Sequence, residues 1–319
     1  MTEDKERMKK HYDLNSKDYN EKMGTGEHGM MHYGDHSDYE RSLTEKIISK
    51  TGLVSRKEVR ESVVNRVKNL AEKADITEQD TVLDSGCGRG GNAVWIAENT
   101  GADVIGLDID EESIEEARRK AEEHGVEERT RFVVGNFDEL PVKDFDVYFA
   151  IESQCHSEDE EKLLEQVYEA LNPGGRLIIS DGFRIKRFDA EDEKIAEKMH
   201  RGWGVDYLAH IDDFRKYLED AGFENIRQQH IQDRIRPTSS YLHRLSILSR
   251  PYVAARLKLA SAAAGFSERT GLGDKNDFEY SRKRYSQLND LLTTARYQYV
   301  AGKQELFAQL DFYAEKPEK

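Results

Sequence analysis

The chain has 319 residues, with 63 acids against 48 bases and a formal charge of −15. This length supports a sizeable core, which excludes small disulfide-stapled folds, and the acid excess argues against a general nucleic-acid binder. No apolar run is long enough to span a membrane, no apolar signal core opens the chain, and only Cys87 and Cys155 are present. We therefore expect a soluble, cytoplasmic protein without a transmembrane segment or a disulfide framework.

The first 58 residues are polar but rich in aromatic and histidine side chains, which a purely disordered tail would seldom need. We predict a helical lid there. His28, His32 and His36 recur every four residues, but intervening glycines weaken a helix that would align them, and no acid or cysteine set completes a ligand frame. We therefore expect no metal site. Apolar residues on one face of 59–74 then predict a helix that leads into a strand.

Strands and helices alternate from residue 81 onward, separated by Gly, Pro and Asn. The predicted strands are 81–85, 103–108, 131–134, 145–151, 175–181 and 224–231, and the predicted helices are 91–99, 111–124, 158–171 and 211–221. Such alternation indicates an α/β fold with a mainly parallel sheet covered by helices on both faces.

About seventy residues then interrupt the sheet before a last strand at 306–314, where apolar and polar residues alternate. We predict one helix after Ser239 and Ser240, a second that begins at Pro251, and stops at Gly265 and Gly271. A long apolar stripe from Phe278 to Tyr299 is expected to pack within the chain rather than to form a dimer seam. The sequence sets no oligomeric state.

These patterns predict four parts of one α/β chain. They are an N-terminal lid (1–58), a core (59–232), a helical insertion that would form an acceptor pocket (233–304), and the last core strand (305–319).

A glycine-rich loop, Asp84-Ser85-Gly86-Cys87-Gly88-Arg89-Gly90-Gly91, joins the first strand to a helix. Glycines there allow a tight turn and a close approach to a ligand at the carboxyl end of the strand. The GxGxxG pattern alone is a weak indicator of a dinucleotide site. Asp84 would repel a pyrophosphate, whereas it could pair with an ammonium group or hold a loop that does so. A ligand with a cationic amino-acid end therefore fits better.

At this point the sequence resembles the class I S-adenosylmethionine-dependent methyltransferases. The resemblance covers roughly residues 59–232 and lies in five motifs in order: VLDSGCGRGG, VIGLDID, VVGNFDELPV, FDVYFAIESQCH and LNPGGRLIISD. It implies a Rossmann-like sheet of seven strands with the last strand antiparallel. It also implies S-adenosyl-L-methionine as the cofactor.

The resemblance assigns the cofactor contacts residue by residue. Asp84, Gly86 and Gly88 would face the methionyl part, and Asp108 would accept the ribose hydroxyls unless it is only a helix cap. Asn136 stands where the family often has an acid for the adenine amino group, and its side-chain carbonyl can still accept. The remaining expected cofactor contacts are Ile109, Phe137, Tyr19 and Tyr33.

Two candidate catalytic residues follow the fourth motif's strand. Glu152 and His156 are four residues apart and share a face if the turn is helical, so either could act as a general base. Alternatively, Glu152 orders the loop and His156 caps the helix that begins near Ser157. Cys87 is expected to be a packed residue rather than a reactive thiol.

The segments outside the motifs resemble sterol, tocopherol and other isoprenoid C-methyltransferases. This resemblance implies that an alkene carbon of a small-molecule acceptor takes the methyl group, inside a pocket whose aromatic faces stabilise a cation. The candidate lining residues are Tyr33, Trp203, Tyr207, His210, Tyr241 and Tyr252. A lipid acceptor would imply transient membrane contact. Two alternatives remain open: N- or O-methylation of a small polar metabolite, and a non-catalytic module that binds the cofactor.

Overall fold

The structure is a computed structural model, and it describes residues 28, 30, 32–37, 39, 42, 54–203, 205, 207–270 and 275–318. The chain divides into two compact units. The first, here called the helical unit, comprises Met1–Lys17, Phe188–Tyr207 and Ser239–Leu306, and the second, the sheet unit, comprises Asp18–Arg187, Leu208–Thr238 and Phe307–Lys319. Among the described residues, no helix is both long and apolar enough to cross a membrane.

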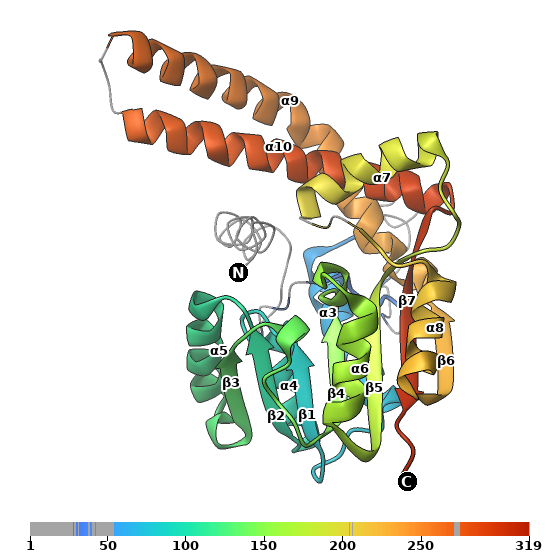
Figure 1. The fold of residues 1–319 in the computed structure, drawn as a ribbon. Helices are drawn as coiled ribbons and strands as arrows, with labels where there is room; N and C mark the ends of the chain where they lie inside the picture. The colour runs from blue at the N-terminus through green and yellow to red at the C-terminus, as the bar shows by residue number, and fades with distance from the viewer. Residues whose placement is uncertain are drawn as a thin grey trace. The chain divides into compact units, whose positions relative to one another are not determined.

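Seven strands form one sheet in the order β3-β2-β1-β4-β5-β7-β6 (Figure 1). All neighbours pair in parallel except β7, which is antiparallel to both β5 and β6. The predicted seven-stranded sheet with an antiparallel last strand is therefore confirmed. The strands are β1 (Thr81–Ser85), β2 (Asp103–Asp108), β3 (Thr130–Val134), β4 (Phe145–Ile151), β5 (Leu171–Arg184), β6 (Glu224–His230) and β7 (Phe307–Glu315).

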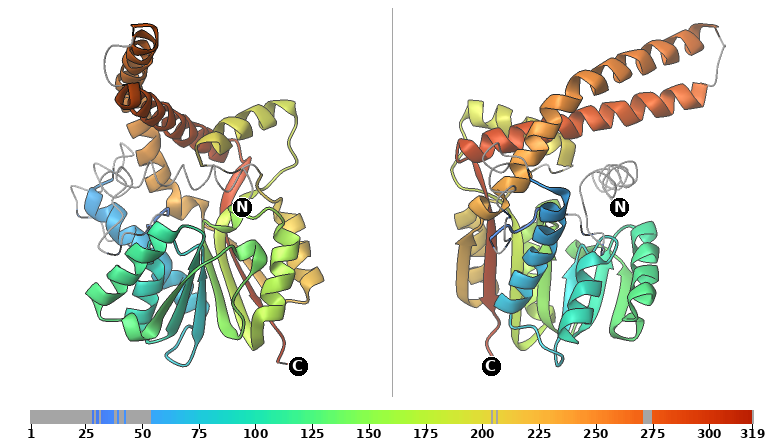
Figure 2. Two further views of the ribbon diagram at one scale, coloured as in Figure 1. Left: turned by 60° about the vertical axis from the view of Figure 1, so that its left-hand side comes forward. Right: turned by 180° about the vertical axis from the view of Figure 1, so that it is seen from behind.

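Helices cover both faces of this sheet, because the central strands carry apolar side chains on both sides (Figure 2). One face packs on α3 (Arg56–Lys73), α4 (Gly91–Thr100) and α5 (Glu111–His124). The other packs on α6 (Glu160–Ala170) and α8 (Ile211–Ala221). The predicted three layers are thus present, and the strands' carboxyl ends are left for short connections.

Local signals place the helix ends close to their predicted positions. Asp110 caps α5 by accepting a hydrogen bond from the backbone N–H of Ser113 at 2.9 Å. Gly125 ends the same helix in the left-handed conformation, with φ of 68°. Three short 3-10 turns follow strands or helices: η1 (Glu127–Arg129), η2 (Phe137–Glu139) and η3 (Gln154–His156).

The helical unit holds α7 (Ala190–Trp203), most of α9 (Gln232–Thr270) and α10 (Lys275–Lys303). Here α9 and α10 lie side by side, since Arg256 Nε contacts Tyr285 Oη at 2.9 Å and the rings of His243 and Tyr299 stack at 4.3 Å (Figure 1). Leu292 of α10 is buried, and α10 packs on α7.

The expected helix start at Pro251 and stop at Gly265 are wrong, because α9 is one helix through both positions. Pro251 is exposed, so the carbonyl group that loses its hydrogen bond can be solvated. Gly265 follows three alanines, whose high helix propensity offsets its cost. The last described residue of α9 is Thr270, and the expected stop at Gly271 lies outside the described residues.

Candidate cofactor-binding and methyl-transfer site

The glycine-rich loop leaves β1 and returns to begin α4. The backbone N–H groups of Gly86 and Cys87 both donate to the carbonyl of Leu107 on β2, at 2.8 and 3.0 Å. Gly86 has φ of +75°, and an added Cβ would lie 2.4 Å from the Cβ of Ser153. The positive φ and the lack of room for a Cβ both select glycine at position 86. The two hydrogen bonds to Leu107 hold the loop against the carboxyl ends of β1 and β2.

Asp84 is a buried carboxylate at the base of this loop, with 1% of the residue exposed. Neither of its oxygens accepts a hydrogen bond within the described part of the chain. Burial, together with the nearby charge of Asp108, raises the pKa of Asp84 to about 7. The backbone N–H of Ala93 on α4 opposes that shift, so a role of Asp84 in holding the loop and a contact with a cationic ligand group both stay predictions.

Asp108 closes β2 beside the same loop. Its oxygens accept from the backbone N–H of Gly88 at 2.8 Å and of Asp110 at 2.9 Å. Burial raises its pKa, and those backbone hydrogen bonds oppose the shift. The cap of α5 is Asp110, so Asp108 is not merely a helix cap. Each carboxylate oxygen can accept two hydrogen bonds, which leaves capacity for two ligand hydroxyls.

The other residues expected to contact the cofactor lie in different local environments. Asn136 caps η2, and its side-chain oxygen accepts from the N–H of Asp138 at 3.1 Å, which leaves one lone pair for an adenine amino group. Phe137 packs partly buried against the core, and Ile109 is half-buried directly after β2. Tyr19 lies outside the described residues.

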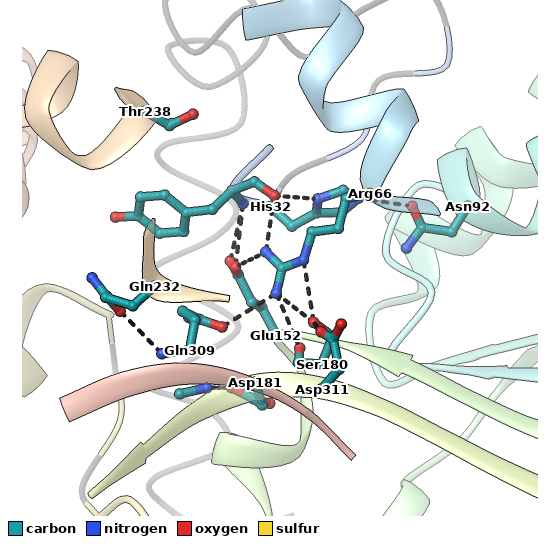
Figure 3. A network of polar contacts seen from close by, with 12 residues as sticks. His32, Arg66, Asn92, Glu152, Ser180, Asp181, Gln232, Thr238, Gln309 and Asp311 are labelled. Carbon is teal, nitrogen blue, oxygen red and sulfur yellow. Dashed lines mark hydrogen bonds and ion pairs between the residues drawn. The ribbon is translucent and has the colours of Figure 1, made fainter. Parts of the chain in front are cut away.

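Glu152, the first candidate base, follows β4 in a left-handed backbone conformation with φ of 50°. Such a conformation is unusual for a glutamate, and the surrounding structure must hold it. Its carboxylate forms an ion pair with the buried guanidinium of Arg66 on α3, and accepts from the N–H of Tyr33 at 3.2 Å (Figure 3). Its side chain is 17% exposed, so the carboxylate is paired yet still reachable.

Arg66 is the centre of a polar network that joins the sheet to α3 (Figure 3). Its Nη2 donates to Ser180 Oγ at 2.9 Å and to Gln309 Oε1 at 3.2 Å. Ser180 in turn donates to Asp311 Oδ1 at 2.6 Å, and the other oxygen of Asp311 pairs with Lys73. A guanidinium with several partners is held in one orientation, which fixes the position of the Glu152 carboxylate.

A short N-terminal segment enters the same network. The carbonyl of Tyr33 accepts from Arg66 at 2.8 Å and faces His32 Nδ1 at 3.0 Å. His32 Nε2 lies 3.2 Å from the side-chain oxygen of Asn92 at the start of α4. Burial and the charge of Arg66 lower the pKa of His32 to about 3, so this imidazole is neutral. Tyr33 thus contacts the candidate base through its backbone.

His156, the second candidate base, lies in η3 rather than on a helix with Glu152, so the two do not share a helical face. It is not a helix cap either, because Asp159 caps α6. Next to η3, buried Asp181 accepts from the N–H of Cys155 at 3.1 Å, and burial raises the pKa of Asp181 to about 6. The catalytic roles of Glu152 and His156 stay predictions.

The positions of the residues expected to contact the acceptor do not test that role. His210 caps α8, since its Nδ1 accepts from the N–H of Asp212 at 3.2 Å. Tyr207 is 51% exposed, Tyr241 is half-buried on α9, and Tyr252 is exposed. The side chain of Trp203 lies outside the described part. Their contact with an acceptor stays a prediction.

Sequence reasoning missed two members of this site. Arg66 lies between Val63 and Val67 on the apolar face of α3, and a base inside an apolar stripe is a signal for a buried charge partner. Asp181 ends the Ile-Ser-Asp run of β5. It could have been found by the same signal as Asp108, an acid near the carboxyl end of a strand. Cys87 is buried as expected, and burial raises the pKa of its thiol.

The comparisons with known proteins agree with this geometry. Residues 76–225 match the family model described as a methyltransferase domain. The chain is 34% identical over 177 residues to the sterol 24-C-methyltransferase ERG6 of Saccharomyces cerevisiae, covering 54% of this chain and 46% of that protein. It is 28% identical over 275 residues to a sterol 24-C-methyltransferase of Kluyveromyces lactis, covering 81% and 72%. The match to the first relative thus spans about half of that protein's length.

Solved structures share the fold. The geranyl diphosphate C-methyltransferase of Streptomyces coelicolor A3(2), in a complex that contains S-adenosyl-L-homocysteine, aligns with a TM-score of 0.63 and 16% identity over 96% of this chain and 97% of that one. The glycine loop, the two strand-end aspartates and the matched domain lead to one assignment. Residues 76–225 form a methyltransferase domain, and these features are consistent with a class I S-adenosylmethionine-dependent methyltransferase.

Proposed function

We propose that this protein transfers a methyl group from S-adenosylmethionine to a carbon atom of an isoprenoid or sterol-type acceptor. The observation that carries the proposal is Glu152, a partly exposed carboxylate at the carboxyl end of β4 that a buried arginine orients. The names of the relatives, which are sterol C-methyltransferases, support the acceptor class.

The residues of the loop fit this cofactor. Asp84 offers a buried carboxylate without a hydrogen-bonding partner among the described residues, which suits an α-ammonium group. Asp108 has acceptor capacity for ribose hydroxyls, and the carbonyl of Asn136 can take the adenine amino group. When bound, S-adenosylmethionine supplies an electrophilic methyl group on a sulfonium. The protein's own task is then to align the acceptor and to manage its proton.

Glu152 is proposed to take that proton. An alkene carbon that gains a methyl group leaves a positive charge on the acceptor, and the acceptor returns to neutrality by losing a proton to a base. The Glu152 carboxylate, oriented by its ion pair with Arg66, both stabilises that cation and can accept the proton. His156, in the turn that follows, is the other candidate for this step.

The test measures S-adenosylhomocysteine release with three acceptor sets: sterols and prenyl compounds, phenols, and amines such as glycine derivatives. We expect turnover with the first set and a product heavier by one methylene unit, carrying a new carbon–carbon bond. Turnover restricted to amines or phenols would overturn the acceptor class. Cofactor binding without any turnover would instead favour a binding module.

Glu152→Gln tests the proposed base. It is expected to lower kcat by about 10²–10⁴-fold while cofactor affinity stays the same. Asp220→Asn on α8, an exposed acid paired with Lys216, is the matched control. Equal kcat for both variants would remove Glu152 from the proton step and direct attention to His156.

A further inference from the structure

Acidic residues are distributed very unevenly along this chain. Residues 239–303 carry 11 bases and 5 acids, a net charge of +6, whereas the rest of the chain carries 37 bases and 58 acids, a net charge of −21. Between Asp233 and Glu268 there is no acid in 34 residues, although the chain average would place about seven there. We call the α9 and α10 portions of residues 239–303 the basic hairpin.

One face of α9 in the basic hairpin exposes large apolar side chains. Leu248, Tyr252, Leu259 and Phe266 are 78%, 62%, 65% and 53% exposed. At about 100° of rotation per residue these four lie within about 40° of one another on the helix. The packed face lies about 120° around the helix from this stripe, where Val253 is buried. The four side chains therefore form a continuous stripe that faces away from the hairpin's own core.

Basic side chains flank this stripe on both edges. Arg244, Lys258 and Arg269 fall on one side and Arg256 on the other, and all four are exposed. A helix with an apolar stripe between exposed cations has the pattern of a segment that lies in the interface of an anionic membrane. There the apolar side chains enter the headgroup boundary while lysine and arginine reach lipid phosphates.

We propose that the basic hairpin docks on the surface of an anionic lipid bilayer through the Leu248–Phe266 stripe. A second copy of the chain is the less favoured occupant, because pairing this stripe with itself would bring like charges from both edges together. The purpose of docking, access to a membrane-resident acceptor, rests on the proposed function, but docking itself requires neither cofactor nor acceptor.

The experiment measures co-sedimentation of the full chain with vesicles of phosphatidylcholine alone or of phosphatidylcholine with phosphatidylglycerol. We expect binding to the anionic vesicles only, weakening as salt rises. Arg244→Glu with Lys258→Glu should lower affinity by at least about tenfold, since each basic residue contributes to attraction by an anionic surface. Leu248→Ser with Leu259→Ser should do the same at low salt.

Lys57→Glu with Lys68→Glu is the matched control, because it changes the charge equally on exposed positions of α3. It should bind vesicles as the parent does. The proposal would be overturned by equal binding to neutral and anionic vesicles, or by a control variant that loses as much vesicle affinity as the hairpin variants. A dimer whose formation depends on Leu248 and Leu259 would overturn it as well. Because no acceptor is present, failure here leaves the proposed methylation untouched, and failure of turnover leaves docking untouched.

A second, independent observation concerns three side chains from separate parts of the sheet unit. His28 Nε2 lies 3.1 Å from Glu98 Oε2, and His124 Nδ1 lies 3.5 Å from the same oxygen. The three ligand atoms all lie within 4.8 Å of one another. In a tetrahedral zinc site with bonds of about 2.0–2.1 Å, neighbouring ligand atoms are about 3.3 Å apart, so two of these edges already match.

The surroundings favour a ligand role for these atoms. The two imidazole rings lie 4.6 Å apart, tilted by 32°, and both direct a nitrogen at Glu98. The side chain of Glu98 is 42% exposed, which leaves room for a water molecule as a fourth ligand.

We infer that His28, Glu98 and His124 bind a zinc-type divalent ion that clasps the N-terminal segment onto α4 and α5. That segment packs on the end of the glycine-rich loop, since an added Cβ on Gly91 would lie 2.7 Å from the carbonyl oxygen of His28. The sequence predicts no metal site from the histidines of the N-terminal segment alone. The ligands proposed here come instead from three separate parts of the chain.

The test uses Zn²⁺ or Co²⁺ alone on the cofactor-free protein. We expect one bound equivalent, a tetrahedral Co²⁺ absorption spectrum, and slower amide exchange in residues 28–33 with metal. His28→Ala, Glu98→Gln and His124→Ala should each weaken binding by more than about 100-fold, beyond the loss of a merely supporting group. His230→Ala, an exposed histidine on β6, is the control.

Circular dichroism and the unfolding midpoint would establish that each variant is folded, and Glu98→Gln is the most conservative of the three. Absence of stoichiometric binding to the parent protein, or affinities in all three variants equal to that of His230→Ala, would overturn the inference.

Discussion

The sheet unit and the basic hairpin handle charge in opposite ways. In the sheet unit the informative charges are buried: Arg66 and Asp84 are each 1% exposed. Arg66, on α3, has specific partners on β5 and β7, in the N-terminal segment and at Glu152 after β4. In the basic hairpin most of the charges are exposed and basic, and they border exposed apolar side chains.

This difference teaches what each kind of charge can do. A buried charge gains from a fixed partner and loses heavily without one, so it can hold a catalytic group in a single position. An exposed charge is screened by salt and contributes little to folding, but many of one sign attract a broad, oppositely charged surface. Buried, paired charges therefore suit a catalytic or binding site, and many exposed charges of one sign suit an interface with another surface.

The largest expected effect is loss of the buried arginine. Arg66→Ala would leave Glu152 without its ion pair and Ser180 and Gln309 without a donor, and should cost about 3–5 kcal/mol of unfolding free energy. Urea unfolding measures it. Arg187→Ala removes an exposed pair with Asp213 and should cost less than about 1 kcal/mol. Similar costs for the two variants would remove the contrast between buried and exposed charge.

The next effect concerns the ribose assignment. Asp108→Ala should weaken S-adenosylmethionine binding by about 1.5–3 kcal/mol, as expected for lost hydrogen bonds to a charged group, and calorimetry measures this. Asp103→Ala, at the exposed start of the same strand, is the control and should leave affinity unchanged. An unaltered affinity in Asp108→Ala would place the ribose elsewhere.

The pH dependence of binding tests Asp84. Its pKa of about 7 means that the free protein holds a proton there below pH 7, and an incoming ammonium group must displace it. Affinity should therefore fall by about tenfold per pH unit below about 7. Asp84→Asn should bind weakly with a flat profile. A slope that survives in Asp84→Asn would belong to another group.

The same group affects stability with the opposite sense from an ordinary paired carboxylate. Because the folded-state pKa of Asp84 is above its ordinary value of 3.8, the folded protein holds the proton more tightly than the unfolded chain does. Its contribution to stability is complete below about pH 4 and is lost as the pH rises through about 7. Cofactor binding should offset that loss, which thermal unfolding with and without cofactor would reveal.

The smallest effect is expected on the exposed stripe. Leu259→Ser should change unfolding free energy by no more than about 0.5 kcal/mol, because the side chain already faces solvent. Val253→Ala on the same helix, at 2% exposure, should cost more than about 1 kcal/mol. A large cost for Leu259→Ser in the absence of membranes would mean that the stripe serves folding rather than docking.

Local patterns were sufficient for most of the architecture. The strand and helix alternation and the glycine-rich loop each depend on residues a few positions apart, so they could be predicted. The errors in α9 arose where local signals conflict. Pro251 and Gly265 interrupt a helix in isolation, but their cost is small when the neighbouring residues favour the helix and the proline faces solvent.

The sequence by itself determined the order of the elements, the acids at the strand ends and the basic, acid-free stretch of α9, because periodicity and composition are properties of the chain. Only the tertiary structure decided the partners. Arg66 meets Glu152 across 86 residues and Gln309 across 243, and His28 meets Glu98 across 70. The packing of the layers also buries the Asp84 carboxylate without a hydrogen-bonding partner in the described part of the chain. Such pairings depend on how the layers pack, which no spacing along the sequence encodes.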